Sequence, residues 1–120
     1  MAQIDLVRLP RSGLLVEWEV RTTEAVGYLR ATEGDTLWIS HIGVAPAFRG
    51  QGWASRLLEV ALDYSNGRAV ALTAAPFPSW REPGLSHDEL RTWYARRGLR
   101  PAPRRRSPYQ MIRPPTFSTA

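Results

Sequence analysis

Several features are absent from this sequence, and each absence excludes a class of protein. There is no cysteine, which excludes disulfides, thiolate metal sites and cysteine nucleophiles. There is no lysine either, so all 16 basic residues are arginines. No apolar run approaches the roughly 20 residues that cross a bilayer, and residues 1–13 lack the apolar segment of a signal peptide. We therefore expect a cytoplasmic protein with no membrane-spanning segment.

The composition is that of a folded protein with a basic surface. Of the 120 residues, 43% are hydrophobic and 22% are charged, so we expect one domain over residues 1–120 with a flexible tail from about residue 115. The net charge of +5 suits a nucleic acid or a phosphorylated small ligand. No sequence motif known to bind in the grooves of DNA or RNA accompanies the arginine cluster at residues 104–106. We therefore favour a solvated loop there over a nucleic-acid interface.

The first third of the chain predicts antiparallel strands and no helix. Residues 14–20 alternate apolar and charged side chains, which indicates a half-buried strand. Residues 4–9 and 25–31 indicate two further strands. Turn signals at residues 10–13 and 33–35 separate the strands, so we expect an antiparallel meander.

The next strand, over residues 36–46, contains a break in its alternation. The apolar residues up to Ile39 and those from Ile42 onward have opposite parity, which would send them to opposite faces of a sheet. One extra residue near Ser40 or His41 would restore the phase, so we predict a β-bulge there. A strand buried on both faces is the alternative, because parity then carries no information.

A change of period at Gly52 predicts a helix. Apolar residues recur at helical spacing over residues 54–62. The helix is expected to stop at residues 65–67, where Gly67 suits a left-handed cap. The short apolar run at residues 69–74 then predicts a strand parallel to the one that precedes the helix.

A second helix and a last strand are predicted beyond the proline-rich loop at residues 76–84. Ser86 and Glu89 match a capping box, which marks the start of a helix. Gly98 suits the end of that helix. Residues 109–114 indicate the final strand.

The stretch "RGQG", residues 49–52, stands at the start of the first predicted helix and is typical of a phosphate cradle. A helix N-terminus presents unpaired N–H groups and a partial positive charge, and glycines let the backbone approach an anion closely. The guanidinium of Arg49 adds a positive charge and paired N–H donors that can bind a phosphate. The phosphate loop of the NTPases is excluded because it requires a lysine. The dinucleotide fingerprint lacks its third glycine here, and an antiparallel sheet precedes it.

Two segments resemble the GNAT superfamily of N-acetyltransferases. "VAPAFRGQGWASRLL", residues 44–58, resembles the acetyl-CoA-binding motif, with Arg49, Gly52 and Ala54 at its fixed positions. "ELRTWYARRGLRP", residues 89–101, resembles the later helix of the superfamily. The residues that match in that helix are Trp93, Tyr94, Gly98 and Leu99. The resemblance covers about residues 14–114, and the closing residues 111–115 are similar to those of short bacterial and phage members.

The resemblance implies a fold, a reaction and a set of site residues. The implied fold is an α+β GNAT-like fold, with a mixed, mostly antiparallel twisted sheet and helices packed on it. The implied reaction is acetyl transfer from acetyl-CoA to the primary amine of an unknown acceptor by direct attack, with no metal. The residues implied to hold the cofactor are Ile42, Gly43, Val44, Arg49, Gly50, Gln51, Gly52, Trp53 and Ala54.

Tyr94 is the implied general acid that protonates the departing thiolate. The base that deprotonates the amine is open. Histidine is the side chain that most often serves as a base near neutral pH, and His41 lies beside the predicted bulge. Glu17, Glu19 and Glu24 are alternatives, as is relay through water without a dedicated side chain.

The sequence departs from the superfamily near its N-terminus. Members usually carry one or two helices between the first and second strands, where this chain has only "PRSG" at residues 10–13. We therefore expect an acceptor site that is open or is completed by a second subunit in a homodimer. A coenzyme A-binding module without turnover, acting as a sensor or interaction partner, is the alternative function.

Overall fold

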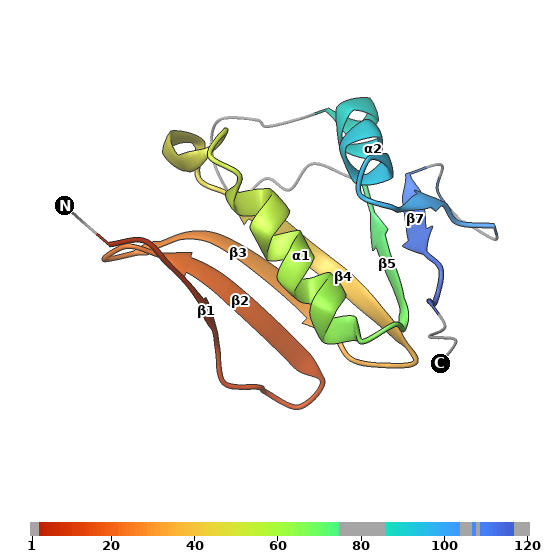
Figure 1. Cartoon of the computed structure of the whole chain (residues 1–120), viewed down its shortest axis with the longest axis horizontal. Coiled ribbons are helices and arrows are strands. Elements are labelled where there is room, and N and C mark those ends of the chain that lie inside the picture. Colours follow the sequence, from red (N-terminus) through yellow and green to blue (C-terminus); the bar gives the residue numbers. More distant parts are fainter. Residues whose placement is uncertain (1–2, 75–85, 104–106, 108, 117–120) are drawn as a thin grey trace.

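The computed structural model describes residues 3–74, 86–103, 107 and 109–116, which form a seven-stranded sheet and two α-helices (Figure 1). The strands are β1 (Asp5–Arg8), β2 (Leu15–Arg21), β3 (Ala25–Thr32), β4 (Thr36–Val44), β5 (Ala69–Thr73), β6 (Arg100–Pro101) and β7 (Gln110–Arg113). The helices are η1 (Pro46–Phe48), α1 (Trp53–Ser65) and α2 (His87–Ala95). The predicted loop at residues 76–84, the cluster at residues 104–106 and tail residues 117–120 lie outside the described residues.

The sheet is mixed, with the order β1-β2-β3-β4-β5-β7-β6. Every neighbouring pair is antiparallel except β4 and β5, which are parallel and are joined by α1. The predicted α+β architecture, the antiparallel meander and the parallel β4–β5 pair are confirmed. The edge strand β6 was not predicted, because its two residues carry no alternating pattern.

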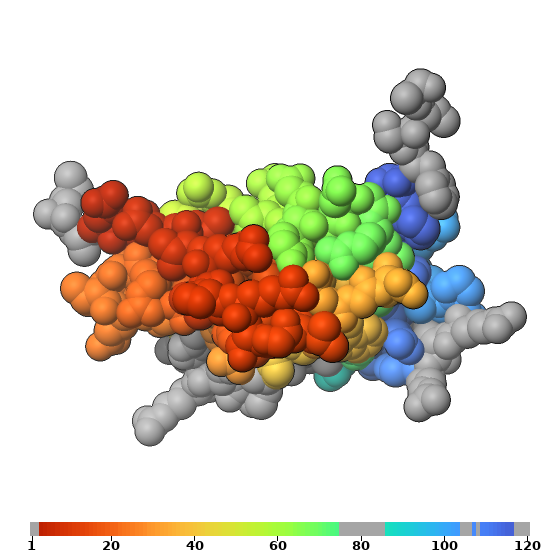
Figure 2. All heavy atoms as spheres, turned by 90° about the horizontal axis from the view of Figure 1, so that it is seen from below, coloured from red at the N-terminus to blue at the C-terminus, as the bar shows by residue number. Residues whose placement is uncertain are grey.

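The core lies between the sheet and α1. The alternation in β2 places Val16, Trp18 and Val20 on the face that α1 covers, where all three are buried. The helix contributes Leu57 and Leu58, which are also buried. Burial of these side chains removes apolar surface from water, which fixes α1 on this face. In the view of Figure 2, α1 lies along one side of the red and orange strands.

The bulge predicted in β4 is present. Arg30 of β3 lies opposite His41, but the next residue of β3, Ala31, lies opposite Ile39. Ser40 is therefore the extra residue, and its hydroxyl donates to the carbonyl oxygen of Arg30 at 3.3 Å. The bulge lets Ile39 and Ile42 pack toward the same side despite their opposite parity.

The helix ends partly follow the sequence signals. α2 begins with the predicted capping box, in which Ser86 and Glu89 bond reciprocally through side chain and backbone. α1 ends on two successive left-handed residues, Asn66 with φ 52° and Gly67 with φ 83°. The left-handed cap predicted at Gly67 thus begins one residue earlier, at Asn66, because asparagine tolerates this conformation better than most residues.

Candidate active site

The strands β4 and β5 diverge on the C-terminal side of the bulge. β4 pairs with β5 from Thr36 opposite Ala69 to Ile39 opposite Leu72, where the pairing stops. β4 nevertheless continues along β3 as far as Val44. Among the described residues, no strand therefore pairs with the β5-facing side of residues 40–44. This divergence opens toward the upper edge of Figure 1, where α1 begins.

Two backbone N–H groups point toward this divergence. The N–H of Ala45 donates to the carbonyl oxygen of Val26 at 2.8 Å, while Gly27 and Val44 lie opposite each other. In an antiparallel ladder this pattern makes Gly27 and Val44 a pair without mutual hydrogen bonds, so the N–H of Val44 points away from β3. Because the direction alternates along a strand, the N–H of Ile42 points the same way. An extended ligand could therefore pair with this side of β4.

The glycine loop leads from this strand end into α1. Gly50 and Gly52 have φ of 78° and 85°, in the left-handed region that favours glycine. A β-carbon built at either position would meet no atom within 4 Å, so the loop surface there is open. No side chain caps the start of α1, and the first intrahelical bond runs from the Arg56 N–H to the Gly52 carbonyl oxygen at 3.1 Å. The first-turn N–H groups are thus oriented to receive an anion.

Arg49 connects the glycine loop to the end of β4. Its side-chain Nε donates to the carbonyl oxygen of Val44 at 2.9 Å, and its backbone N–H donates to the carbonyl oxygen of Pro46 at 3.3 Å. The predicted role of Arg49 in anion binding stays a prediction. Its backbone N–H, however, is already used within η1, so the anion-binding N–H groups of the loop begin after Arg49.

Trp53, the first residue of α1, carries an unusual donor. Its indole Nε1 is buried and has no hydrogen-bond partner in the described part of the chain. The guanidinium of Arg56 lies over its ring, 4.7 Å from the ring centre. A buried donor without a partner is costly, and its position beside the cradle is where a ligand could supply an acceptor.

Tyr94 lies in α2 and is 3% exposed. Its ring packs edge-on against Trp93 at a centroid distance of 5.1 Å. Burial raises the pKa of Tyr94 well above its usual value, so the phenol carries its proton at neutral pH. That is the protonation state that a general acid needs, while the role itself stays a prediction.

Arg97 joins the helix of Tyr94 to the start of α1, and sequence reasoning did not assign it a role. Its Nη2 donates to the hydroxyl oxygen of Ser55 at 2.7 Å, across 42 positions of the sequence. Its Nη1 donates to the carbonyl oxygen of Trp93 at 2.9 Å. No local signal could have shown this contact, because it depends on how the two helices are placed by the sheet.

His41 lies on the face of the sheet opposite α1. The register sets His41 beside Arg30 and Arg30 beside Glu17, and residues opposite one another share a face. The Nδ1 of His41 lies 3.2 Å from the Ser40 hydroxyl. Glu17 pairs with Arg30 at 3.0 Å, and Glu19 pairs with Arg21. Both carboxylates on this face already have a cationic partner, which makes them weaker base candidates.

Within the described residues, no group of three or more histidines, aspartates and glutamates is placed to hold a metal ion. None of the described helices is long and apolar enough to cross a membrane.

Comparison with known proteins identifies the family. The model of the acetyltransferase (GNAT) family matches residues 2–81. This chain belongs to the GNAT acetyltransferase family. The match includes the bulged strand β4, the glycine loop and α1, which together form the candidate cofactor site described above. No curated protein matches the chain significantly by sequence.

Solved structures share the fold at low sequence identity. The anti-CRISPR protein AcrVA5 is 20% identical with a TM-score of 0.62, over 89% of this chain and 96% of its own. An acetyltransferase described as related to histone acetyltransferase HPA2, from Corynebacterium glutamicum, is 18% identical with a TM-score of 0.67. That match covers 89% of this chain and 68% of the Corynebacterium protein. The PaiA N-acetyltransferase of Thermoplasma acidophilum, solved with coenzyme A, is 11% identical with a TM-score of 0.61. The match covers 83% of this chain and 60% of PaiA.

Proposed function

We propose that this GNAT protein transfers an acetyl group from acetyl-CoA to a primary amine by direct attack of the amine. The observation that carries the proposal is the divergence of β4 from β5 directly before an open glycine loop at a helix N-terminus. An extended thioester ligand with a pyrophosphate needs both features, a strand edge for its arm and N–H donors for its phosphates.

The residues present fit coenzyme A. The pantetheine arm would lie along residues 42–44 and accept from the N–H groups of Ile42 and Val44. The pyrophosphate would lie at Gly50 to Ala54, where the backbone is open and the buried Nε1 of Trp53 lacks a partner among the described residues. When bound, acetyl-CoA supplies the activated acetyl group. Of the two β4 donors, the N–H of Ile42 lies farther from the glycine loop and would stabilise the thioester oxygen as it gains charge, an effect worth roughly 3 kcal/mol for one oriented donor.

Two side chains carry the proposed proton transfers. Tyr94 would protonate the departing thiolate, because its raised pKa keeps the phenol protonated at neutral pH. Such a transfer contributes about 10²–10⁴-fold to the rate. His41 is the proposed base for the amine, with relay through water as the alternative. Its position on the face opposite α1 is reachable by an acceptor that approaches from that side.

The experiment is an acceptor screen with acetyl-CoA in which release of free thiol is measured. Amine-dependent thiol release by the wild type supports the proposal, and Tyr94→Phe should lower turnover by about 10²-fold or more. Tyr109→Phe is the matched control and should retain turnover. If Tyr94→Phe has wild-type turnover under conditions where chemistry is slow, Tyr94 is not the acid.

A coenzyme A-binding module without turnover is the second candidate function. One observation favours it: among the described elements, α1 is the helix that packs on β2, β3 and β4, and it packs on the face opposite His41. α1 therefore does not wall an acceptor site on the His41 face. Tight binding of coenzyme A without thiol release across a broad panel of amines would favour this function over transfer.

A further inference from the structure

A cavity between α1 and α2 has no part in the transfer described so far. Its volume is about 200 Å³. Ser55, Leu58, Glu59 and Leu62 form its α1 wall, and Arg97, just after α2, forms the other side. Ser55 is the third residue of α1, so the cavity begins directly beside the glycine loop.

Arg97 is the cationic group of this cavity. Among the described residues, its contacts with Ser55 and with the Trp93 carbonyl use two of the five N–H groups of the guanidinium. The guanidinium also stacks on the Trp93 ring, 3.7 Å from the ring centre. Burial and the neighbouring charge of Arg96 lower the pKa of Arg97, but an arginine remains charged at any working pH. A held, partly buried guanidinium with donors to spare is suited to a phosphate.

The chemistry of coenzyme A says which phosphate lies within reach. The molecule carries pantetheine on one side of its pyrophosphate and adenosine 3′-phosphate on the other. With pantetheine along β4 and the pyrophosphate at the glycine loop, the adenosine end leaves the loop on the other side from β4. The cavity begins at Ser55, in the first turn of α1, and is the cavity next to the loop in the described residues that such an end could enter. Its volume is below the roughly 300–1,000 Å³ of pockets that enclose a whole drug-sized ligand, so it would take only part of the cofactor.

We propose that this cavity binds the adenosine 3′-phosphate end of coenzyme A, with Arg97 pairing with the 3′-phosphate. Leu62, which is half-buried, provides apolar surface for the nucleoside, and the buried Leu58 closes the cavity beneath it. The contact between Arg97 and Ser55 holds the guanidinium beside the glycine loop before the ligand arrives. This inference rests on the proposed function, because it assumes that the pyrophosphate binds at the loop.

Glu59 constrains where the phosphate lies. Its carboxylate is on the α1 wall of the cavity, and its negative charge acts on Arg97 by raising the pKa of the guanidinium. A second anion beside Glu59 would be repelled, so the 3′-phosphate is expected at the side of Arg97 that faces away from Glu59. Glu59→Gln should therefore strengthen binding of the 3′-phosphorylated ligand and leave binding of its dephosphorylated form unchanged.

The test compares coenzyme A with 3′-dephospho-coenzyme A by calorimetric titration of the full chain. The wild type should bind coenzyme A about tenfold or more tightly than the dephosphorylated form, since a hydrogen-bonded charge contributes on this scale. Arg97→Leu should bring that ratio close to one, and Arg97→Lys should leave an intermediate ratio. Arg91→Leu is the matched control, because Arg91 lies in α2, the helix that precedes Arg97, but pairs with Asp88, and it should keep the wild-type ratio.

The outcomes separate this inference from the proposed function. If the wild type binds both ligands equally, the cavity does not bind the 3′-phosphate, although acetyl transfer can stand. If Arg97→Leu weakens both ligands by the same factor, Arg97 only joins the two helices and the inference is wrong. If the wild type binds neither ligand, the proposed function fails and this inference fails with it. Glu59 is exposed, so the Glu59→Gln variant is expected to fold. Its affinities for the two ligands therefore test the inference even if Arg97→Leu does not fold.

Discussion

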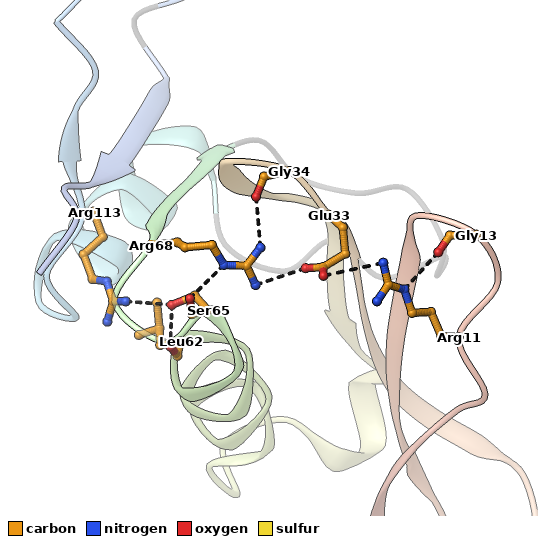
Figure 3. Close-up of polar contacts among 8 residues, drawn as sticks. All are labelled: Arg11, Gly13, Glu33, Gly34, Leu62, Ser65, Arg68 and Arg113. Atoms are coloured by element: carbon orange, nitrogen blue, oxygen red, sulfur yellow. Dashed lines mark hydrogen bonds and ion pairs between the residues drawn. The ribbon is translucent and has the colours of Figure 1, made fainter.

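The two ends of α1 satisfy their polar groups in different ways. At the C-terminal end, the protein itself supplies most of the partners (Figure 3), although the Nε of Arg113 is buried without one in the described residues. Glu33 lies between Arg68, at 3.1 Å, and Arg11, at 3.7 Å. Arg68 also donates to the carbonyl oxygen of Ser65 at 2.8 Å, and the buried Ser65 hydroxyl accepts from Arg113 at 2.9 Å. These contacts join the helix to the β3–β4 turn and to β7.

At the N-terminal end, the partners are missing among the described residues. No side chain caps the helix, Gly50 and Gly52 face open space, and the Nε1 of Trp53 is buried without an acceptor. Left-handed glycines occur at both ends, but a β-carbon at Gly67 would meet the carbonyl oxygen of Thr116 at 2.8 Å. The same residue type therefore serves close packing at one end and an open surface at the other. An end that the protein leaves unsatisfied is where a ligand is expected to complete the structure.

Substitution of Gly52 should give the largest effect and should act on the ligand. Gly52→Val places a branched side chain at φ 85° where the pyrophosphate would approach. Loss of even one charge-assisted N–H contact costs about 1.5–3 kcal/mol, so affinity for acetyl-CoA should fall by at least tenfold and up to about 10²-fold. Calorimetric titration measures it. An affinity within twofold of the wild type would contradict the placement of the cofactor.

Substitution of Gly67 should lower the free energy of unfolding and leave the affinity for coenzyme A unchanged. Gly67→Ala brings the left-handed penalty of about 1–2 kcal/mol, and the contact with Thr116 adds to it. Gly52→Ala is the matched control, because it carries the same backbone penalty without a close neighbour. Urea denaturation should show a larger loss for Gly67→Ala than for Gly52→Ala. Equal losses would mean that the contact between Gly67 and Thr116 does not constrain the fold.

Removal of the Ser65 hydroxyl should have a comparable effect on the same end. Ser65→Ala removes the acceptor of Arg113, whose Nε is already buried without a partner in the described residues. The cost should be about 1–3 kcal/mol of the free energy of unfolding, with affinity for coenzyme A unchanged. A stability equal to the wild type would show that Arg113 finds another acceptor.

The pH dependence of Glu33 should give the smallest effect. Burial alone would raise its pKa, but hydrogen bonds from Arg68 and Tyr64, with the charges of Arg68 and Arg11, lower it below 4.5. The unfolded chain therefore takes up this proton at a higher pH than the folded chain. The contribution is present above about pH 4.5 and is lost as the pH falls through the folded pKa. Glu33→Gln should flatten the acid side of the stability curve, and an unchanged curve would argue against the ion pairs.

The sequence predicted the features that local pattern determines. The parity change between Ile39 and Ile42 located the bulge, and the two glycines before a helical period located the open loop. The contacts of side chains across the fold were not predicted. Arg97 reaches Ser55 only because the sheet sets the two helices together, and Arg49 bonds to Val44 rather than only facing a ligand. Such contacts depend on tertiary placement, which spacing along the chain does not encode.

The proposed function places acetyl-CoA at the N-terminal end of α1 and the adjoining edge of β4. Amide hydrogen exchange, resolved by residue and measured with and without acetyl-CoA, tests it most directly. Bound acetyl-CoA should slow exchange of the N–H groups of Val44 and of residues 52–54 and leave exchange at Ser65 and Gly67 unchanged. Protection confined to the C-terminal end of α1, or none at Val44 and residues 52–54 at saturating ligand, would contradict it.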